Sequence, residues 1–207
     1  VGQKFANAAL QAAGFTAAVY ATRSAIEGTI GKLANLFDQL AQAKAGFESI
    51  VGARAGNALL EDIREFARVS PFVTQELVNY SQQLLGVGVA AEKIVPLLRD
   101  TGNVISSVGG DTQNLGRVLF TLTQIQTIGR LTGQDAMQLQ SALIPITKML
   151  ATSLNKTIPE VKKLQEQGKI SAKQVFDAID LAGGKYAGSM DNAVKTVVGA
   201  FSVLNDT

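Results

Sequence analysis

Apolar residues recur at a spacing of seven along the first fifty residues, a stretch that has no proline. One column of this pattern begins at Phe5 and ends at Phe47, and all seven of its members are apolar, whereas the companion column is apolar at only four of seven positions. A full column beside a broken one predicts a long helix with a single narrow apolar seam, which is typical of packing between helices of different chains. The predicted seam consists of Val19, Ile26, Ile30, Leu33, Phe37, Leu40 and Phe47.

The same segment leaves a second interpretation open. Residues from Phe5 to Thr22 carry no charge and reach the minimum length for a membrane span. Polar Gln3, Asn7 and Gln11 and the many alanines make the segment only weakly hydrophobic, which favours an interchain helix. A membrane-active segment from Phe5 to Ile30 remains the alternative.

After Gly52 the pattern changes to shorter helices with their own start and stop signals. Asn57 is a candidate N-cap for a helix to Ala67, and Asp111 or Thr112 for a later one. Ser70-Pro71 predicts a stop and a restart, with the next helix ending near Gly86 or Gly88. Pro96 predicts a kink or a break within a helix over residues 90–108.

Two corners share one arrangement: Gly129-Arg-Leu-Thr132 and Gly168-Lys-Ile-Ser171. In each, the glycine ends a helix, the basic residue neutralises the negative end of that helix, and the apolar residue anchors the corner. Thr132 and Ser171 then cap the following helices, as does Thr157 with Glu160. Gly183-Gly184 predicts a bend before a last helix over residues 189–205.

No segment alternates apolar and polar residues over a strand's length. The sequence therefore predicts an all-α protein with two parts. Residues 1–52 form a long amphipathic, coiled-coil-like helix, and residues 53–207 form a compact multi-helix domain of short capped helices. The sequence starts without Met and ends within an expected helix, so we expect it to be part of a longer polypeptide.

Composition narrows the classes of function. The charged fraction of 17% is below the usual value of about 25%, which indicates a surface covered by a partner. A net charge of +2 without a basic cluster argues against specific nucleic-acid binding. The chain has no His and no Cys, which removes the commonest general base and the commonest metal ligands.

The remaining candidates for chemistry are weak. Glu61 and Glu65 share a helix face, as do Asp177 and Asp180, but nearby basic residues indicate exposed ion pairs. Gly183-Gly184-Lys185 lacks the first glycine and the Ser or Thr of a phosphate-binding loop. We expect no catalytic residue, no cofactor and no metal.

From about Asn57 to Asp206, nearly three quarters of the chain, the sequence resembles the tape measure domain of long-tailed bacteriophages and prophages. The departures are Asn103, where the family often has Asp, and Leu143, where it often has Gly. The resemblance rests on the order and spacing of several short motifs, among them Arg64-Glu-Phe-Ala-Arg-Val-Ser-Pro-Phe72, Ile94-Val-Pro-Leu-Leu98, Gly129-Arg-Leu-Thr-Gly133, Val161-Lys-Lys-Leu-Gln-Glu-Gln-Gly-Lys-Ile-Ser171 and Gly183-Gly-Lys-Tyr-Ala-Gly-Ser-Met190.

The resemblance implies a structural protein that lies in the tail lumen or at the tail tip, sets tube length and leaves with the DNA. It further implies assembly in the host cytoplasm, three or six copies, and contacts with tail tube, tail tip or baseplate proteins and tail assembly chaperones. Contact with the host membrane is a further possibility. A fully helical chain of this length would reach only about 310 Å. We therefore expect a folded part of a longer ruler, located near the tip.

Overall fold

The computed structural model describes residue 38 and residues 40–195. Contacts divide the chain into two compact units, Val1–Gln42 and Ala43–Thr207. This boundary precedes the predicted one after residue 52, because Ala43 and Phe47 already belong to the buried core. Most of the predicted long helix lies outside the described residues. Its expected end near residue 51 is described, and there Gly52 takes a left-handed backbone conformation with φ of 84°.

The second unit is built from helices throughout its described part, and its one piece of strand-like pairing is an isolated bridge between Arg130 and Ser171. This confirms the all-α prediction for those residues. Helical residues 43–51 open the unit and residues 189–195 close its described part. Between them lie α2 (Ala53–Arg68), α3 (Thr74–Gly86), α4 (Ala91–Ser107), α5 (Thr112–Ile128), α6 (Gly133–Ser141), α7 (Ile146–Ser153), α8 (Ile158–Glu166) and α9 (Ala172–Lys185).

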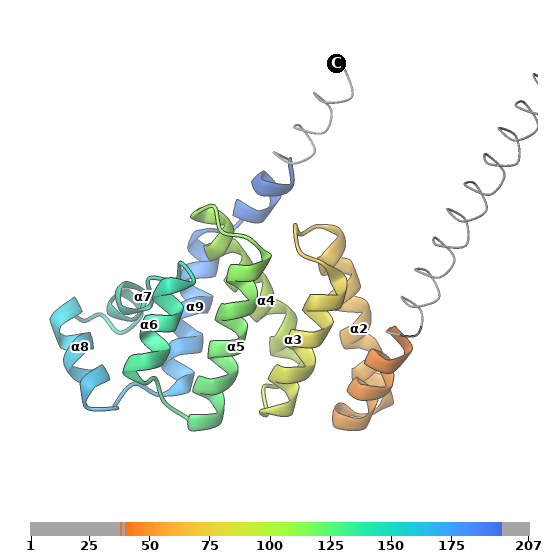
Figure 1. The fold of residues 1–207 in the computed structure, drawn as a ribbon, viewed down its shortest axis with the longest axis horizontal. Coiled ribbons are helices and arrows are strands. Elements are labelled where there is room, and N and C mark those ends of the chain that lie inside the picture. The colour runs from red at the N-terminus through yellow and green to blue at the C-terminus, as the bar shows by residue number, and fades with distance from the viewer. Residues whose placement is uncertain (1–37, 39, 196–207) are drawn as a thin grey trace, which may run out of the picture. The chain divides into compact units, whose positions relative to one another are not determined.

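The helices pack as two layers (Figure 1). One layer runs through α2, α4, α9 and α7, and α8 packs on α7 at its end. The other layer runs through α3, α5 and α6. Leu98 of α4, Leu122 of α5 and Ile179 of α9 are among the fully buried side chains between the layers. The apolar stripe of each helix, formed by residues at helical spacing, is buried where the two layers meet.

The structure differs from the predicted helix start at Asn57 and from the predicted break at Pro96. α2 begins at Ala53 rather than at Asn57, because the corner at Gly52 is tight enough for helix to follow helix almost directly. The Asn57 side chain lies inside α2, where its Nδ2 donates to the Ala53 carbonyl at 2.8 Å and to Glu48 Oε1 at 2.9 Å. It therefore ties the two helices together instead of capping one.

Pro96 does not break its helix, since α4 continues from Ala91 to Ser107. Proline removes the hydrogen bond that its own nitrogen would donate and crowds the carbonyl of the preceding turn. Ile94 and Leu98, on either side of it, are fully buried. Burial of these side chains outweighs the loss of one backbone hydrogen bond.

Leu143, in the loop between α6 and α7, has φ of 68°, a left-handed conformation that favours glycine. This conformation accounts for the glycine that the resemblance leads one to expect there. The chain keeps the glycine-like backbone but adds a leucine side chain, which is 41% exposed.

Candidate functional site

Most of the predicted oligomer seam lies outside the described residues, namely Val19, Ile26, Ile30, Leu33 and Phe37. Leu40 is described and is partly buried. Phe47 has no exposed surface, and its backbone lies against Gly56 of α2. Phe47 therefore belongs to the core of its own chain and has no surface left for a second copy.

The two similar corners of the sequence lie side by side in the structure. The Leu131 backbone N–H donates to the Ile170 carbonyl at 2.9 Å, and the Ala172 N–H donates to the Gly129 carbonyl at 2.9 Å. Leu131 and Ile170 are both fully buried. The pairing joins the α5–α6 corner to the α8–α9 corner, so that two loops satisfy each other's backbone groups.

The caps at these corners are local and complete. Gly129 ends α5 in a left-handed conformation, and Gly168 takes one after α8. Thr132 caps α6, with Asp135 accepting from the Thr132 N–H at 2.9 Å and from its hydroxyl at 2.6 Å. Ser171 caps α9 with Gln174 in the same way. Both boxes satisfy the free N–H groups of the helix start.

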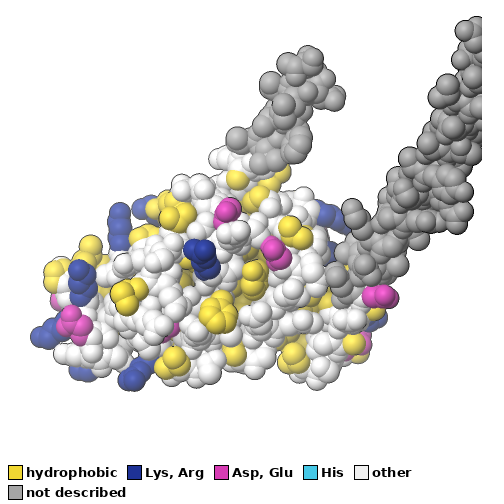
Figure 2. Space-filling view, in the orientation of Figure 1, with side chains coloured by type: hydrophobic (Ala, Val, Ile, Leu, Met, Phe, Trp, Pro, Cys, Tyr) yellow, Lys and Arg dark blue, Asp and Glu magenta, His cyan; other side chains and the backbone are white. Residues whose placement is uncertain are grey.

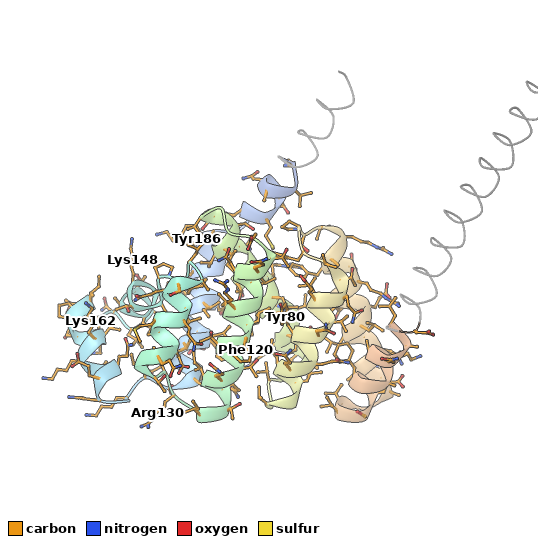
Figure 3. The ribbon with its side chains drawn as sticks, viewed as in Figure 1. Tyr80, Phe120, Arg130, Lys148, Lys162 and Tyr186 are labelled. Carbon is orange, nitrogen blue, oxygen red and sulfur yellow. The ribbon has the colours of Figure 1, made fainter. Side chains whose placement is uncertain are left out.

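The basic residue of the first corner, Arg130, lies close to the glycine of the second corner. Figure 3 labels Arg130 where the two corners meet. A side chain at Gly168 would meet the Arg130 guanidinium, whose Nη1 lies 2.9 Å from the ideal Cβ position. Arg130 thus also lies against the end of α8, in addition to following the end of its own helix, α5.

Of the other two predicted corners, the one at Ser70-Pro71 is present in the structure and the one at Gly183-Gly184 is not. Ser70 and Pro71 lie in the turn between α2 and α3, where the Ser70 hydroxyl accepts from the Phe72 N–H at 3.4 Å. Gly183 and Gly184 do not bend the chain, because α9 continues through both and ends at Lys185. The bend follows at residues 186–188, before the helix over residues 189–195.

Gly183 has a packing role instead. An ideal Cβ on Gly183 would lie 2.5 Å from the Asp100 Cα and 2.5 Å from Asp100 Oδ1. Real Cβ atoms do not approach backbone atoms so closely, so only glycine permits this crossing of α4 and α9. The crossing is among the most extensive contacts between described helices.

The crossing brings together two carboxyl groups that sequence reasoning did not connect. Burial, the charge of Asp180 and a hydrogen bond to Asp180 together raise the pKa of Asp100 from 3.8 to about 6, against a lowering by Arg99. The expected partners of Asp180 were on its own helix, and Asp177 does pair there with Lys173 at 2.7 Å. Gly183, one turn after Asp180, was the signal that another helix lies close.

Apolar side chains are also exposed near α7 and α8. A hollow of about 490 Å³, here named the α7–α8 groove, lies between the end of α4, the α6–α7 loop, α7 and α8. In Figure 2, Lys and Arg side chains gather with apolar ones at this end of the unit, and Figure 3 labels two of the lysines. Its main lining residues are Val108, Leu143, Pro145, Ile158, Lys148 and Lys162.

Comparison with known proteins decides the family. The family model described as "Tape measure protein" matches residues 31–207. The chain belongs to the tape measure protein family. No curated protein and no solved structure matches the chain.

The match spans the whole second unit of this tape measure chain and begins within the predicted long helix. It confirms the resemblance drawn from the motifs after Asn57. The family is one of structural phage proteins, so the chain is a component of the phage tail in the virion.

The described part of the tape measure chain offers neither a metal-binding cluster nor a membrane-spanning helix. Within residues 38 and 40–195, no three His, Cys, Asp or Glu side chains gather in a way that could hold a metal ion. None of the described helices is both long enough and apolar enough to cross a bilayer. The proposed membrane-active segment, Phe5 to Ile30, lies outside that search.

Proposed function

We propose that this chain is the folded part of a longer tape measure protein that templates tail tube length from inside the tail lumen and leaves the tube with the DNA. The family match over residues 31–207 is the observation that carries the proposal. A protein that measures length must be extended. A helix that does not fold back on itself meets this need, because it adds about 1.5 Å of length per residue. The predicted helix over residues 1–52 supplies such a segment.

The described unit is suited to docking rather than to measuring. Its helices have at most 17 residues, or about 26 Å, and they fold back on one another in two layers. A unit folded in this way adds far less length per residue than an extended helix. We place it near the tail tip, where a ruler must be anchored, with tail tip or baseplate and tube proteins as its neighbours and tail assembly chaperones as partners during assembly in the host cytoplasm.

Tail length tests the ruler. Deletion of residues 5–32 removes four heptads and therefore keeps the register of the remaining seam. A phage with this deletion should form tails that are shorter by about 42 Å, the length of the deleted helix. A phage with the same residues duplicated should form tails longer by about 42 Å. Electron micrographs of purified tails measure both. Tails of unchanged length in both phages would refute the templating proposal.

We further propose that copies of the chain associate as a trimer or hexamer through the part of the predicted seam that precedes the buried Phe47. Leu33→Asp together with Leu40→Asp places two charges in the seam and should abolish self-association of a peptide of residues 1–50. Analytical ultracentrifugation measures the mass of the peptide. Unchanged mass in the double variant would remove the seam assignment.

A second candidate function rests on the charge-free stretch from Phe5 to Thr22. In this alternative the first thirty residues insert into the host membrane and aid DNA passage. The peptide of residues 1–50, added to liposomes loaded with a fluorescent dye, tests it. Dye release would favour insertion, and the absence of both binding and release would exclude it.

A further inference from the structure

We propose that the α7–α8 groove binds an acidic amphipathic helix of another protein. Three observations carry this inference: exposed apolar side chains that line a hollow, lysines without ionic partners at its rim, and a strained backbone that holds one of the apolar residues in place. The inference concerns a partner of the folded unit and is independent of whether the chain sets tail length.

The floor of the groove is apolar and comes from three separate places in the chain. Val108 ends α4, Leu143 lies in the α6–α7 loop, and Ile158 begins α8. Their exposed fractions are 51%, 41% and 46%. Large apolar side chains exposed together around a hollow of about 490 Å³ form the kind of surface that receives a partner's apolar residues.

The strain at Leu143 argues that this surface is specific. A leucine with φ of 68° costs free energy that a glycine would not. Leu143 keeps the strained backbone while exposing its side chain on the groove, and one of its methyl groups would lie 3.1 Å from a Cβ on Gly110. A solvent-exposed leucine side chain offsets little of this free-energy cost, whereas burial of the same side chain against a partner would offset more of it.

The lysines at the groove indicate that a partner would carry acidic side chains. Lys148 and Lys162 line the groove, no carboxylate lines it, and neither lysine makes an ion pair with any residue that the structure describes. A neighbouring hollow on the α7–α9 side shares Pro145 and Lys148 and adds Lys185 and Tyr186, without a carboxylate, whereas the hollow on the α6–α8 side shares Lys162 and includes Glu166. Figure 3 shows Lys148, Lys162 and Tyr186 at this end of the unit. An apolar floor with a cationic rim is complementary to a helix with an apolar face and acidic flanks.

The chain's own segments lack this chemistry. Residues 1–37 carry Lys4, Arg23 and Lys32 against the single acidic Glu27, and residues 196–207 carry only Asp206. On α2, acidic and arginine side chains alternate, and Glu61 is already paired with Arg64 at 3.4 Å. Neither terminal segment of this sequence has an apolar face with acidic flanks, so we take a helix of another protein as the occupant and leave a second copy to the test below.

The test uses the 207-residue chain and two fluorescein-labelled peptides of eighteen residues. Both peptides have leucine on one helical face, and one has glutamate and the other lysine on the flanks. Fluorescence anisotropy at low salt should show binding of the glutamate peptide at least 10-fold tighter than that of the lysine peptide. Equal binding of the two, or no binding of the glutamate peptide, would overturn the proposal.

Variants locate the binding. Leu143→Gly relieves the backbone strain and removes the side chain, so it should raise the thermal midpoint of unfolding while it weakens binding of the glutamate peptide about 10-fold. Lys148→Glu together with Lys162→Glu should reverse the peptide preference. Phe120→Ser, on exposed α5 surface away from the groove, is the matched control and should change neither peptide's affinity.

Three further results would count against the proposal. Undiminished binding to Leu143→Gly would place the peptide elsewhere. Binding to phosphatidylglycerol vesicles that exceeds binding to the glutamate peptide would indicate a lipid surface as the occupant. Self-association that Leu143→Gly abolishes would indicate a second copy.

Discussion

At the scale of single residues, the crossing of α4 and α9 depends on Gly183. The position has no room for a side chain, because the Asp100 backbone lies directly above it. The adjacent Gly184 is also helical, but a Cβ there would meet nothing within 4 Å. Two neighbouring glycines in one helix thus differ completely in what they allow.

Gly183→Ala should destabilise the unit by about 2 kcal/mol, because α4 and α9 must separate to admit the methyl group. Gly184→Ala is the matched control, and should stabilise the unit by about 0.5–1 kcal/mol through its higher helix propensity. Urea unfolding followed by circular dichroism measures both. Equal effects of the two substitutions would show that the crossing is looser than the structure indicates.

The carboxyl pair at the same crossing makes stability depend on pH. The raised pKa of Asp100, about 6, means that the folded chain binds a proton more tightly than the unfolded chain does. Above pH 6 Asp100 is charged, and its burial and its repulsion by Asp180 destabilise the fold to their full extent. The free energy of unfolding should therefore rise as the pH falls from 7 through 6 to 5 and Asp100 takes up a proton. Asp100→Asn should reduce this rise, whereas Asp177→Asn, at an exposed position of α9, should preserve it.

Thermal unfolding of the wild type and both variants at pH 5 and pH 7 measures the effect. Glu160 has its pKa lowered by hydrogen bonds from Thr157, so its contribution to stability is lost only at lower pH, outside this window. A wild-type stability that does not change between pH 5 and pH 7 would contradict the account of the pair.

At the scale of elements, local sequence determined much of what could be predicted. Thr132 with Asp135 and Ser171 with Gln174 gave correct helix starts, because capping depends on residues three positions apart. The pairing of these corners could not be predicted, since backbone hydrogen bonds between distant loops leave no residue pattern. The predicted bend at Gly183-Gly184 was wrong because glycine suits both a turn and a close helix crossing. Only the position of α4 distinguishes the two.

The cap at Thr132 gives a direct test of this scale. Thr132→Ala should destabilise the unit by about 1–2 kcal/mol, because it removes the cap of α6 and leaves the buried Asp135 carboxylate with one hydrogen bond fewer. Thr127→Ala, at an exposed position of α5 whose hydroxyl only donates back to the Thr123 carbonyl, should change stability by less than about 0.5 kcal/mol. Urea unfolding compares them, and similar costs for both would argue against the cap.

At the scale of the whole molecule, the fold class and the family followed from the sequence, whereas the layers and the groove did not. Apolar periodicity shows that a helix is buried, but the identity of its neighbours depends on contacts between distant residues. Leu143 illustrates the limit: the sequence shows it only as a departure from the glycine that the family often has, and the structure adds its left-handed backbone and its exposure at the groove.

The integrity of the two layers can be tested in α5. Leu122→Asp buries a charge between the layers and should unfold the unit at 25 °C, at a cost of about 4 kcal/mol or more. Phe120→Asp changes an apolar residue to the same acid two positions away, but Phe120 is 52% exposed, so the variant should remain folded. Circular dichroism distinguishes the two, and a folded Leu122→Asp variant would contradict the core assignment.

The folded unit is part of the tail in the virion, and we propose that it docks near the tip. A cryo-electron microscopy reconstruction of intact tails tests it most directly. The account predicts density for the crossing of α4 and α9 inside the tail, next to tip or baseplate proteins. Density for the unit in the middle of the tube or near the head would contradict its assigned position, and purified virions without the unit would contradict its role in the tail.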